Sequence, residues 1–223
     1  MDFSALEKEA SRYENQLRAH RRALHQIPEV GYEEHETHAY LMEQLRALAP
    51  DDLKTYAETG IRAVFRGDGT GRVISFRSDI DALPISEKTG CAFASRHPGR
   101  MHACGHDGHT TVGLALARLL ASLKDQLRGT IKLCFQPAEE GVRGAHAMVE
   151  SGIVDDVDYM LGAHFGFKMR KTGTVACNVT GFLATSKYDA RFQGVPAHAG
   201  AAPEQGKNAL LAAACATLNL HAI

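Results

Sequence analysis

The densest group of metal-binding residue types is the segment Met101–His109, which reads MHACGHDGH and directly precedes a predicted helix. Cys104 and His106 are separated by one glycine, so a thiolate and an imidazole can reach the same ion. These are ligands that borderline transition metals take. The alternative is a polar loop that caps the next helix, with Asp107 near the helix start. Three carboxylates could orient an imidazole from behind: Asp79, Asp81 and Asp107.

Two further polar segments follow predicted strands. In Phe135–Gly141 (FQPAEEG), Pro137 ends the strand and two adjacent carboxylates follow, Glu139 and Glu140. Neighbouring side chains of a non-helical segment point to different sides, so one can bind a metal while the other acts as a general base. The alternative is a solvated acidic turn. His164 ends another strand, and a hydrogen-bonded structural histidine is the alternative there. Together the segments have the composition of a two-metal hydrolase site.

The elements that must position these residues alternate between helix and strand. Helical spacing predicts helices at 3–25, 32–48, 108–123 and 144–151. Short apolar or β-branched runs predict strands at 62–66, 72–77, 130–135 and 159–164. This alternation predicts a layered α/β domain whose sheet is covered on both faces. In such sheets, ligand sites gather in the loops at the strand ends.

The pattern changes near residue 180. Residues 185–193 alternate as a half-buried strand does, 194–205 form a loop, and 206–221 form an Ala/Leu-rich helix. Because one strand and one helix cannot close a core, we expect a second domain to begin here. The expected domains are therefore 1–179 and 180–223. The sequence stops at LNLHAI, within a helix-like run, and we expect the chain to be truncated at this end.

Composition excludes several classes of protein. The 223 residues carry 25 basic and 26 acidic side chains, a net charge of −1, with no basic face. Nucleic acid or an anionic membrane is therefore not expected as the main partner. No apolar stretch is long enough to span a bilayer, and the acidic N-terminal segment lacks a signal core. The five cysteines form no regular ladder, so we expect free thiols and a cytoplasmic protein.

The order of these motifs resembles that of the M20 metallopeptidase/amidohydrolase family, in its subgroup of aminoacylase, hippurate-hydrolase and auxin-conjugate-hydrolase type. The Cys-Gly-His-Asp-Gly-His block is the most specific match. The matching segments occur in family order over nearly the whole chain: LHQIPE (24–29), DIDALP (79–84), MHACGHDGH (101–109), FQPAEEG (135–141), AHFG (163–166) and AHAG (197–200).

The resemblance implies a role for particular residues. Glu139 matches the general base that activates the attacking water. His198 matches a histidine that swings into the active site, often from a partner subunit, to hydrogen-bond the developing oxyanion. Four residues match the ligands of two divalent metal ions, manganese or zinc: Cys104, His106, Glu140 and His164.

The resemblance also implies a fold and an activity. The fold is a three-layer αβα metallohydrolase catalytic domain with an inserted α+β lid, or dimerisation, domain, of which the first strand and helix are present. The activity is amide hydrolysis of N-acyl amino acids. Within this subgroup, the sequences of segments 131–159 and 181–223 most resemble enzymes that cleave p-aminobenzoyl-glutamate to p-aminobenzoate and glutamate, so we expect this substrate. Hippurate-like, N-acetyl or indole-acetyl substrates are the alternative, and a homo- or hetero-dimer through the lid is implied.

The chain departs from the family pattern in two places. Other branches carry a His-x-Asp metal motif where this chain has Asp79-x-Asp81, so Cys104 and His106 must supply that ligation. The family also places one more metal-binding histidine after the lid, in a segment that this sequence does not contain. A truncated, inactive product or a non-catalytic subunit is therefore the alternative to an active hydrolase.

Overall fold

The computed structural model describes the chain except for residues 1–2, 142, 167–170, 178–187 and 222–223. The chain forms two units, Met1–Thr174 and Val175–Ile223, and each is described by itself. The expected boundary between residues 179 and 180 falls outside the described residues and stays a prediction. In the part of the chain that the structure describes, no helix is both long and apolar enough to cross a membrane.

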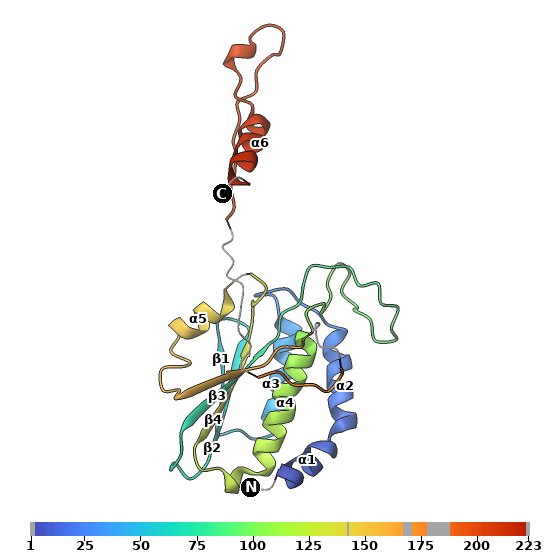
Figure 1. Ribbon diagram of the computed structural model, residues 1–223, viewed down its shortest axis with the longest axis vertical. Coiled ribbons are helices and arrows are strands. Elements are labelled where there is room, and N and C mark those ends of the chain that lie inside the picture. Colours follow the sequence, from blue (N-terminus) through green and yellow to red (C-terminus); the bar gives the residue numbers. More distant parts are fainter. Residues whose placement is uncertain (1–2, 142, 167–170, 178–187, 222–223) are drawn as a thin grey trace. The chain divides into compact units, whose positions relative to one another are not determined.

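A five-stranded mixed sheet forms the centre of the first unit (Figure 1). β2 is antiparallel to β1 and β4, whereas β3 is parallel to β4 and β5. The carboxyl ends of β3, β4 and β5 therefore meet at one edge. Four of the strands match predicted ones, and β1 was not predicted. In spatial order the strands are β1 (Asp52–Tyr56), β2 (Gly60–Arg66), β4 (Thr130–Gln136), β3 (Val73–Asp79) and β5 (Tyr159–Gly162).

Helices cover both faces of this sheet (Figure 1). α3 and α4 pack on one face, and α2 packs against α4. α5 lies on the other face. Along β4, Leu133 and Phe135 enter the core under α3 and α4, while Cys134 contacts Met148 of α5, as strand alternation requires. The predicted α/β class with its covered sheet is confirmed. The helices are α1 (Phe3–Ser11), α2 (Glu14–His25), α3 (His35–Arg46), α4 (His106–Ser122), α5 (Gly144–Glu150) and the short η1 (Lys124–Gln126).

The second unit contains one regular helix in its described part. Its elements are η2 (Pro203–Gln205) and α6 (Ala209–Leu220). Of the predicted strand Thr185–Gln193, residues 185–187 lie outside the described residues, and Tyr188–Gln193 form no strand. That part of the prediction is wrong. A strand needs a neighbouring strand for its N–H and C=O groups, and the described part of this unit provides only a single bridge between Val195 and Lys207.

The long loop between β3 and α4 is anchored by Glu87. Its carboxylate accepts hydrogen bonds from the Thr89 hydroxyl, from Ser95 N at 2.6 Å and from His25 Nε2 at 3.2 Å. His25 Nδ1 also bonds Asp107, at 2.8 Å. Because carboxylates only accept, this arrangement of both ring nitrogens against carboxylates favours the charged imidazole of His25. The hydrogen bond to Asp107 raises the pKa of His25 accordingly. Through these hydrogen bonds, His25 of α2 connects Glu87 of the loop with Asp107 at the start of α4.

Glu87 makes the stability of this loop depend on pH. Burial alone would raise the pKa of Glu87, but hydrogen bonds from Thr89, Ser95 and His25 lower it from 4.5 to about 2. A depressed carboxyl pKa contributes stability above 4.5 that is lost as the pH falls toward 2. We therefore expect Glu87→Gln to lower the Tm at neutral pH, with a difference from the wild type that shrinks below pH 4.5. Thermal unfolding followed by circular dichroism, at pH values from neutral to below 4.5, measures the Tm of the variant and of the wild type.

The matched control is Glu14→Gln, which removes an exposed ion pair with Arg18 within α2. An exposed pair contributes little, so this change should hardly affect the Tm at any pH. If Glu87→Gln lowered the Tm equally at neutral and acidic pH, the charge of Glu87 would not be the cause.

Candidate metal centre

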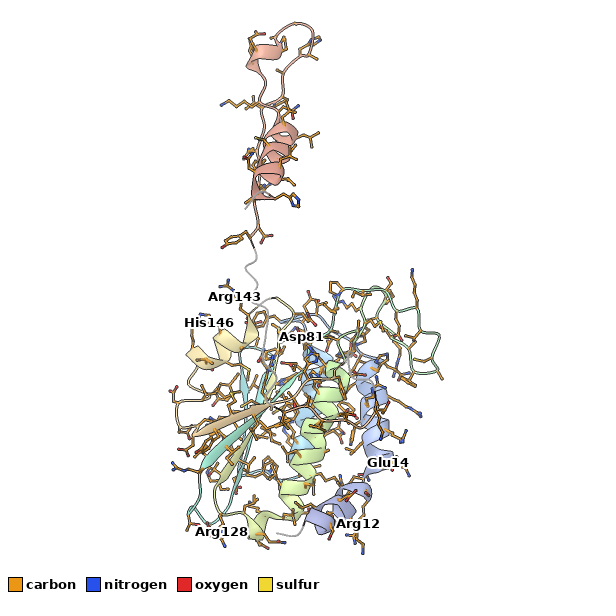
Figure 2. All side chains as sticks on the ribbon, viewed as in Figure 1. Arg12, Glu14, Asp81, Arg128, Arg143 and His146 are labelled. Atoms are coloured by element: carbon orange, nitrogen blue, oxygen red, sulfur yellow. The ribbon has the colours of Figure 1, made fainter. Side chains whose placement is uncertain are left out.

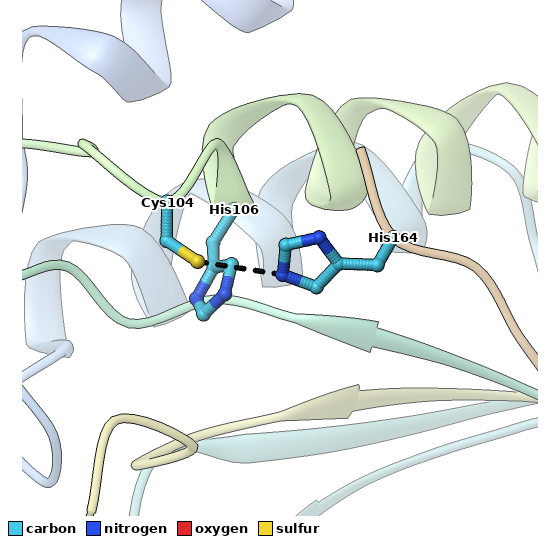
Figure 3. A group of neighbouring side chains, drawn as sticks. All are labelled: Cys104, His106 and His164. Carbon is cyan, nitrogen blue, oxygen red and sulfur yellow. Dashed lines mark hydrogen bonds between the residues drawn. The ribbon is translucent and has the colours of Figure 1, made fainter. Parts of the chain in front are cut away.

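Cys104, His106 and His164 come together at the edge where β3, β4 and β5 end. Cys104 lies in the loop before α4, His106 is the first residue of α4, and His164 follows β5. Cys104 Sγ lies 3.3 Å from His164 Nε2, and Figure 3 shows the two side chains facing one another. The ligand atoms of all three residues lie within 4.8 Å of one another. The three side chains are thus close enough to share one ion.

His106 is held with one ring nitrogen presented to this cluster. Its Nδ1 lies 2.9 Å from the backbone oxygen of Asp81 and 3.1 Å from Asp81 Oδ1. A carbonyl oxygen only accepts, so Nδ1 carries the proton of the neutral ring, and Nε2 of that tautomer has a free lone pair. Nε2 is buried without a hydrogen-bond partner among the described residues. A buried imidazole with a carboxylate behind it and an unpaired nitrogen in front is the usual arrangement of a metal ligand.

Glu139 and Glu140 approach the same nitrogen from the segment after β4. Each has a carboxylate oxygen 4.0 Å from His106 Nε2. These distances do not test the expectation that the two side chains point to different sides, which stays a prediction. Ala138 has a positive φ of 51°, which turns the backbone, and Glu140 N donates to Asp81 Oδ2 at 2.8 Å. The segment therefore curls around His106, at a backbone cost of about 1–3 kcal/mol for the left-handed alanine.

Negative charge accumulates in this cluster. Burial, a hydrogen bond with Glu140 and the charges of neighbouring carboxylates raise the pKa of the Cys104 thiol to about 12. Burial and the carboxylates of Asp79 and Glu140 raise the pKa of Glu139. A divalent cation would reverse both effects, because it stabilises a thiolate and neighbouring carboxylates. The donor set of thiol, imidazole and carboxylate therefore fits a divalent metal.

The orienting roles expected for three aspartates divide between different histidines. Asp81, labelled in Figure 2, orients His106 as predicted. Asp107 bonds His25 instead of an imidazole of the cluster. Asp79 Oδ2 lies 3.4 Å from Nδ1 of His109, whose Nε2 accepts the backbone N–H of Phe165 at 3.2 Å. His109 Nδ1 has no hydrogen-bond partner among the described residues, as is the case for His106 Nε2, and Asp79, His106 and His109 form a further group of possible ligands.

Two residues near the site were not singled out from the sequence. Glu34, which is fully buried, accepts a hydrogen bond from Ala138 N at 2.8 Å. Arg77 forms an ion pair with Asp79 and lies 3.9 Å from Glu139 Oε1. Arg77 lies on β3 and could have been suspected from its place beside the strand end. Nothing in the sequence connects Glu34 to a residue 104 positions away.

His198 belongs to the second unit, and the structure describes its own surroundings. It is exposed, and its Nδ1 accepts the backbone N–H groups of Gly200 and Ala201 at 3.2 and 3.1 Å. The proton of the neutral ring is therefore on Nε2, which can donate a hydrogen bond. The structure brings the other five predicted site residues together in the first unit.

Comparison with known proteins identifies the family. The model of peptidase family M20/M25/M40 matches residues 75–220. The chain belongs to the M20 family. That match includes the cysteine, histidine and glutamate residues of the cluster.

Within the family, the chain is similar to two curated hydrolases. The chain is 55% identical over 172 residues to one subunit of the p-aminobenzoyl-glutamate hydrolase of Escherichia coli strain K12, covering 74% of this chain and 39% of that protein. It is 54% identical over 172 residues to indole-3-acetyl-aspartic acid hydrolase of Enterobacter agglomerans, with the same coverage of 74% and 39%. The chain thus spans about two fifths of the length of these relatives.

A solved structure supports the fold and the metal chemistry. A dinuclear metal-binding peptidase of the M20 family from Bacillus subtilis is 38% identical, with a TM-score of 0.68, covering 71% of this chain and 45% of that chain. Among the described residues, three groups of possible ligands share His106: one with Cys104 and His164, one with Asp79 and His109, and one with Glu139 and Glu140. Both observations support a centre for two divalent metals.

Substitution of Cys104 is the most specific test of this metal centre. We expect Cys104→Ala to lower the amount of metal that the purified chain retains, because a thiolate ligand is lost. Emission spectroscopy after loading with Mn²⁺ or Zn²⁺ measures the stoichiometry. Cys177→Ala, which removes an exposed thiol of the second unit, is the control and should leave it unchanged. Equal metal content in the wild type and in Cys104→Ala would remove Cys104 from the ligand set.

Proposed function

We propose that this chain carries the catalytic centre of a metal-dependent amidohydrolase that cleaves N-acyl amino acids. The observation that carries the proposal is the meeting of Cys104, His106, His164 and the Glu139–Glu140 pair at one sheet edge. Membership of the M20 family supports it, as does the likeness to a dinuclear metal-binding peptidase. The proposed ligands of two divalent ions, manganese or zinc, are Cys104, His106, Glu140 and His164.

The proposed substrate is an aromatic acyl group joined to an acidic amino acid. The two similar relatives are named for p-aminobenzoyl-glutamate and for indole-3-acetyl-aspartic acid, at 55% and 54% identity. Both names describe an aromatic acyl group in amide linkage to a dicarboxylic amino acid. We take p-aminobenzoyl-glutamate as the first candidate and indole-3-acetyl-aspartate as the second.

The residues of the cluster suit the steps of amide hydrolysis. Divalent ions in this site would polarise the amide carbonyl and acidify a water molecule. Glu139 accepts the proton of the attacking water, because its carboxylate is 37% exposed and lies beside His106. A pKa raised by burial and neighbouring carboxylates makes Glu139 a better base and lets it return the proton to the leaving amine. Asp81 keeps the proton of His106 on Nδ1 throughout.

His198 is proposed to donate a hydrogen bond to the oxyanion. Its Nε2–H is free for this role because Nδ1 is occupied by two backbone N–H groups. The second unit is also proposed to pair subunits as a lid or dimerisation domain. α6 supports this proposal, since the helix has no charged residue and exposes four leucines: Leu210, Leu211, Leu218 and Leu220. The partner is a second copy of this chain or a related protein.

The state of the cysteines supports a cytoplasmic location as part of the proposal. All five are free thiols, which a reducing compartment maintains. The alternative to the enzyme is a non-catalytic subunit or an inactive product. An amide-hydrolysis panel with added Mn²⁺ or Zn²⁺, run on this chain and on a longer protein that contains it, distinguishes the two. Absence of turnover in both would favour the non-catalytic alternative.

Glu139→Gln separates catalysis from metal binding. We expect the variant to retain metal while kcat for p-aminobenzoyl-glutamate falls by about 10²–10⁴-fold, because the base is lost. Release of p-aminobenzoate and metal content are measured on the same preparation. Glu150→Gln, an exposed carboxylate of α5, is the control and should keep full activity. A metal-replete Glu139→Gln enzyme with wild-type turnover would refute the assignment of the base.

His198→Ala tests the contribution of the second unit. We expect kcat to fall by about 10²–10³-fold, the usual effect of losing one oxyanion donor. Metal content should not change, because His198 is not a proposed ligand. Turnover and metal content of the variant are compared with those of the wild type. His221→Ala removes another histidine of the same unit and serves as the control. A kcat equal to that of the wild type would exclude the oxyanion role.

A further inference from the structure

Glu34 occupies a helix start but does not cap the helix. It is the N-cap residue of α3, and its side chain makes no capping hydrogen bond. The capping is done by Glu29, whose carboxylate accepts Glu36 N at 3.0 Å and Thr37 N at 2.8 Å. The carboxylate of Glu34 is therefore available for another contact.

That contact is with Ala138, which directly precedes Glu139 in the chain. Glu34 Oε1 accepts the backbone N–H of Ala138 at 2.8 Å, and Oε2 accepts the Thr59 hydroxyl at 2.6 Å. Glu34 is 0% exposed, and no lysine, arginine or histidine lies within ion-pair distance of it among the described residues. A buried carboxylate is costly unless its oxygens are hydrogen-bonded. Both oxygens of Glu34 accept a hydrogen bond. The bond from Ala138 N fixes the backbone of Ala138, and the bond from the Thr59 hydroxyl fixes the Glu34 carboxylate.

The backbone around Ala138 is held from several sides. Ala138 O accepts the N–H of Gly144 at 3.0 Å, and a Cβ on Gly144 would lie 1.8 Å from the carbonyl oxygen of Pro137. Two residues further on, Glu140 N donates to Asp81. Glu139 thus lies between two backbone N–H groups that are each fixed by a buried carboxylate. Loss of the Glu34 contact would release Ala138 from its positive φ, which an L-residue does not favour.

We propose that Glu34 is a positioning residue that fixes Ala138 in its left-handed conformation, so that Glu139 and Glu140 face His106. The inference rests on the proposed function, because it assigns Glu34 to the carboxylates of that site. Glu34 itself does not bind metal, since both of its oxygens are occupied and it is fully buried. Its effect on the site passes through Ala138.

Co²⁺ binding tests the inference without relying on turnover. Glu34→Met keeps the length of the side chain and removes both acceptors. We expect it to weaken Co²⁺ binding to the chain by about 10–100-fold, the range found when a group that orients a ligand is lost. The ligand-field absorption of bound Co²⁺ should also change, because Glu140 is displaced. Glu34→Gln keeps one acceptor oxygen for Ala138 N and should restore binding and spectrum.

Glu29→Met is the matched control. It removes a buried carboxylate from the same loop that also accepts two backbone N–H groups, but those belong to α3 and not to residues 137–140. We expect Glu29→Met to lower the Tm while Co²⁺ binds as in the wild type. Equal loss of Co²⁺ binding in Glu29→Met and Glu34→Met would show a merely structural effect and overturn the inference.

The remaining outcomes also decide the question. A folded Glu34→Met chain with wild-type affinity and spectrum overturns the inference but leaves the metal centre intact. If Glu34→Met does not fold, Thr59→Val decides, since it removes the hydroxyl that holds Glu34 Oε2. We expect Thr59→Val to weaken Co²⁺ binding by about threefold or more, and unchanged binding overturns the inference. Absence of Co²⁺ binding by the wild-type chain would refute the proposed centre itself, which distinguishes that failure from failure of the inference about Glu34.

Discussion

The two oxygens of one buried carboxylate, Asp81, connect the parts of the site. Oδ1 lies 3.1 Å from His106 Nδ1, and Oδ2 accepts the backbone N–H of Glu140 at 2.8 Å. Asp81 follows β3, His106 begins α4, and Glu140 follows β4. One side chain thus sets the tautomer of an imidazole and the position of a carboxylate from different elements. Because both oxygens receive a donor, the buried charge of Asp81 is stabilised by the contacts that organise the site.

Several acidic groups lie close together in the cluster, at and just below the surface. Arg77 pairs with Asp79, and Glu139, Glu140 and the Cys104 thiol lie close by. Burial first, and the neighbouring carboxylates second, raise the pKa of both Cys104 and Glu139. A structural network would be expected to balance its charges, whereas a metal site is balanced only when the ion is bound. The charge distribution therefore favours a metal centre over a polar loop or an acidic turn.

Patterns local in the sequence predicted much of this arrangement. Apolar runs predicted four strands, and the motifs after them gave the cluster residues, because parallel strands bring their carboxyl ends to one edge. β1 was missed because DLKTY is mostly polar and only half-buried at the edge of the sheet. The backbone path of residues 137–140 could not be predicted, because it depends on the positive φ of Ala138. Glu34 could not be found, since its contact is set by tertiary packing across 104 residues.

The site therefore depends on two kinds of residue, the metal ligands and the residues that orient them, and the first kind is more easily recognised in the sequence. Ligands are visible in the sequence because their chemistry requires particular side chains. Asp81 could be found because it lies in the DIDALP segment after a predicted strand. Glu34 acts through a backbone N–H group, which any sequence possesses, so it leaves no motif of its own. Preorganisation of a catalytic carboxylate needs both, because a base held loosely must lose conformational freedom in the transition state. In this chain Glu34 already bonds the left-handed Ala138 in the folded protein, so under the proposed function the segment that carries Glu139 is ordered before any substrate binds.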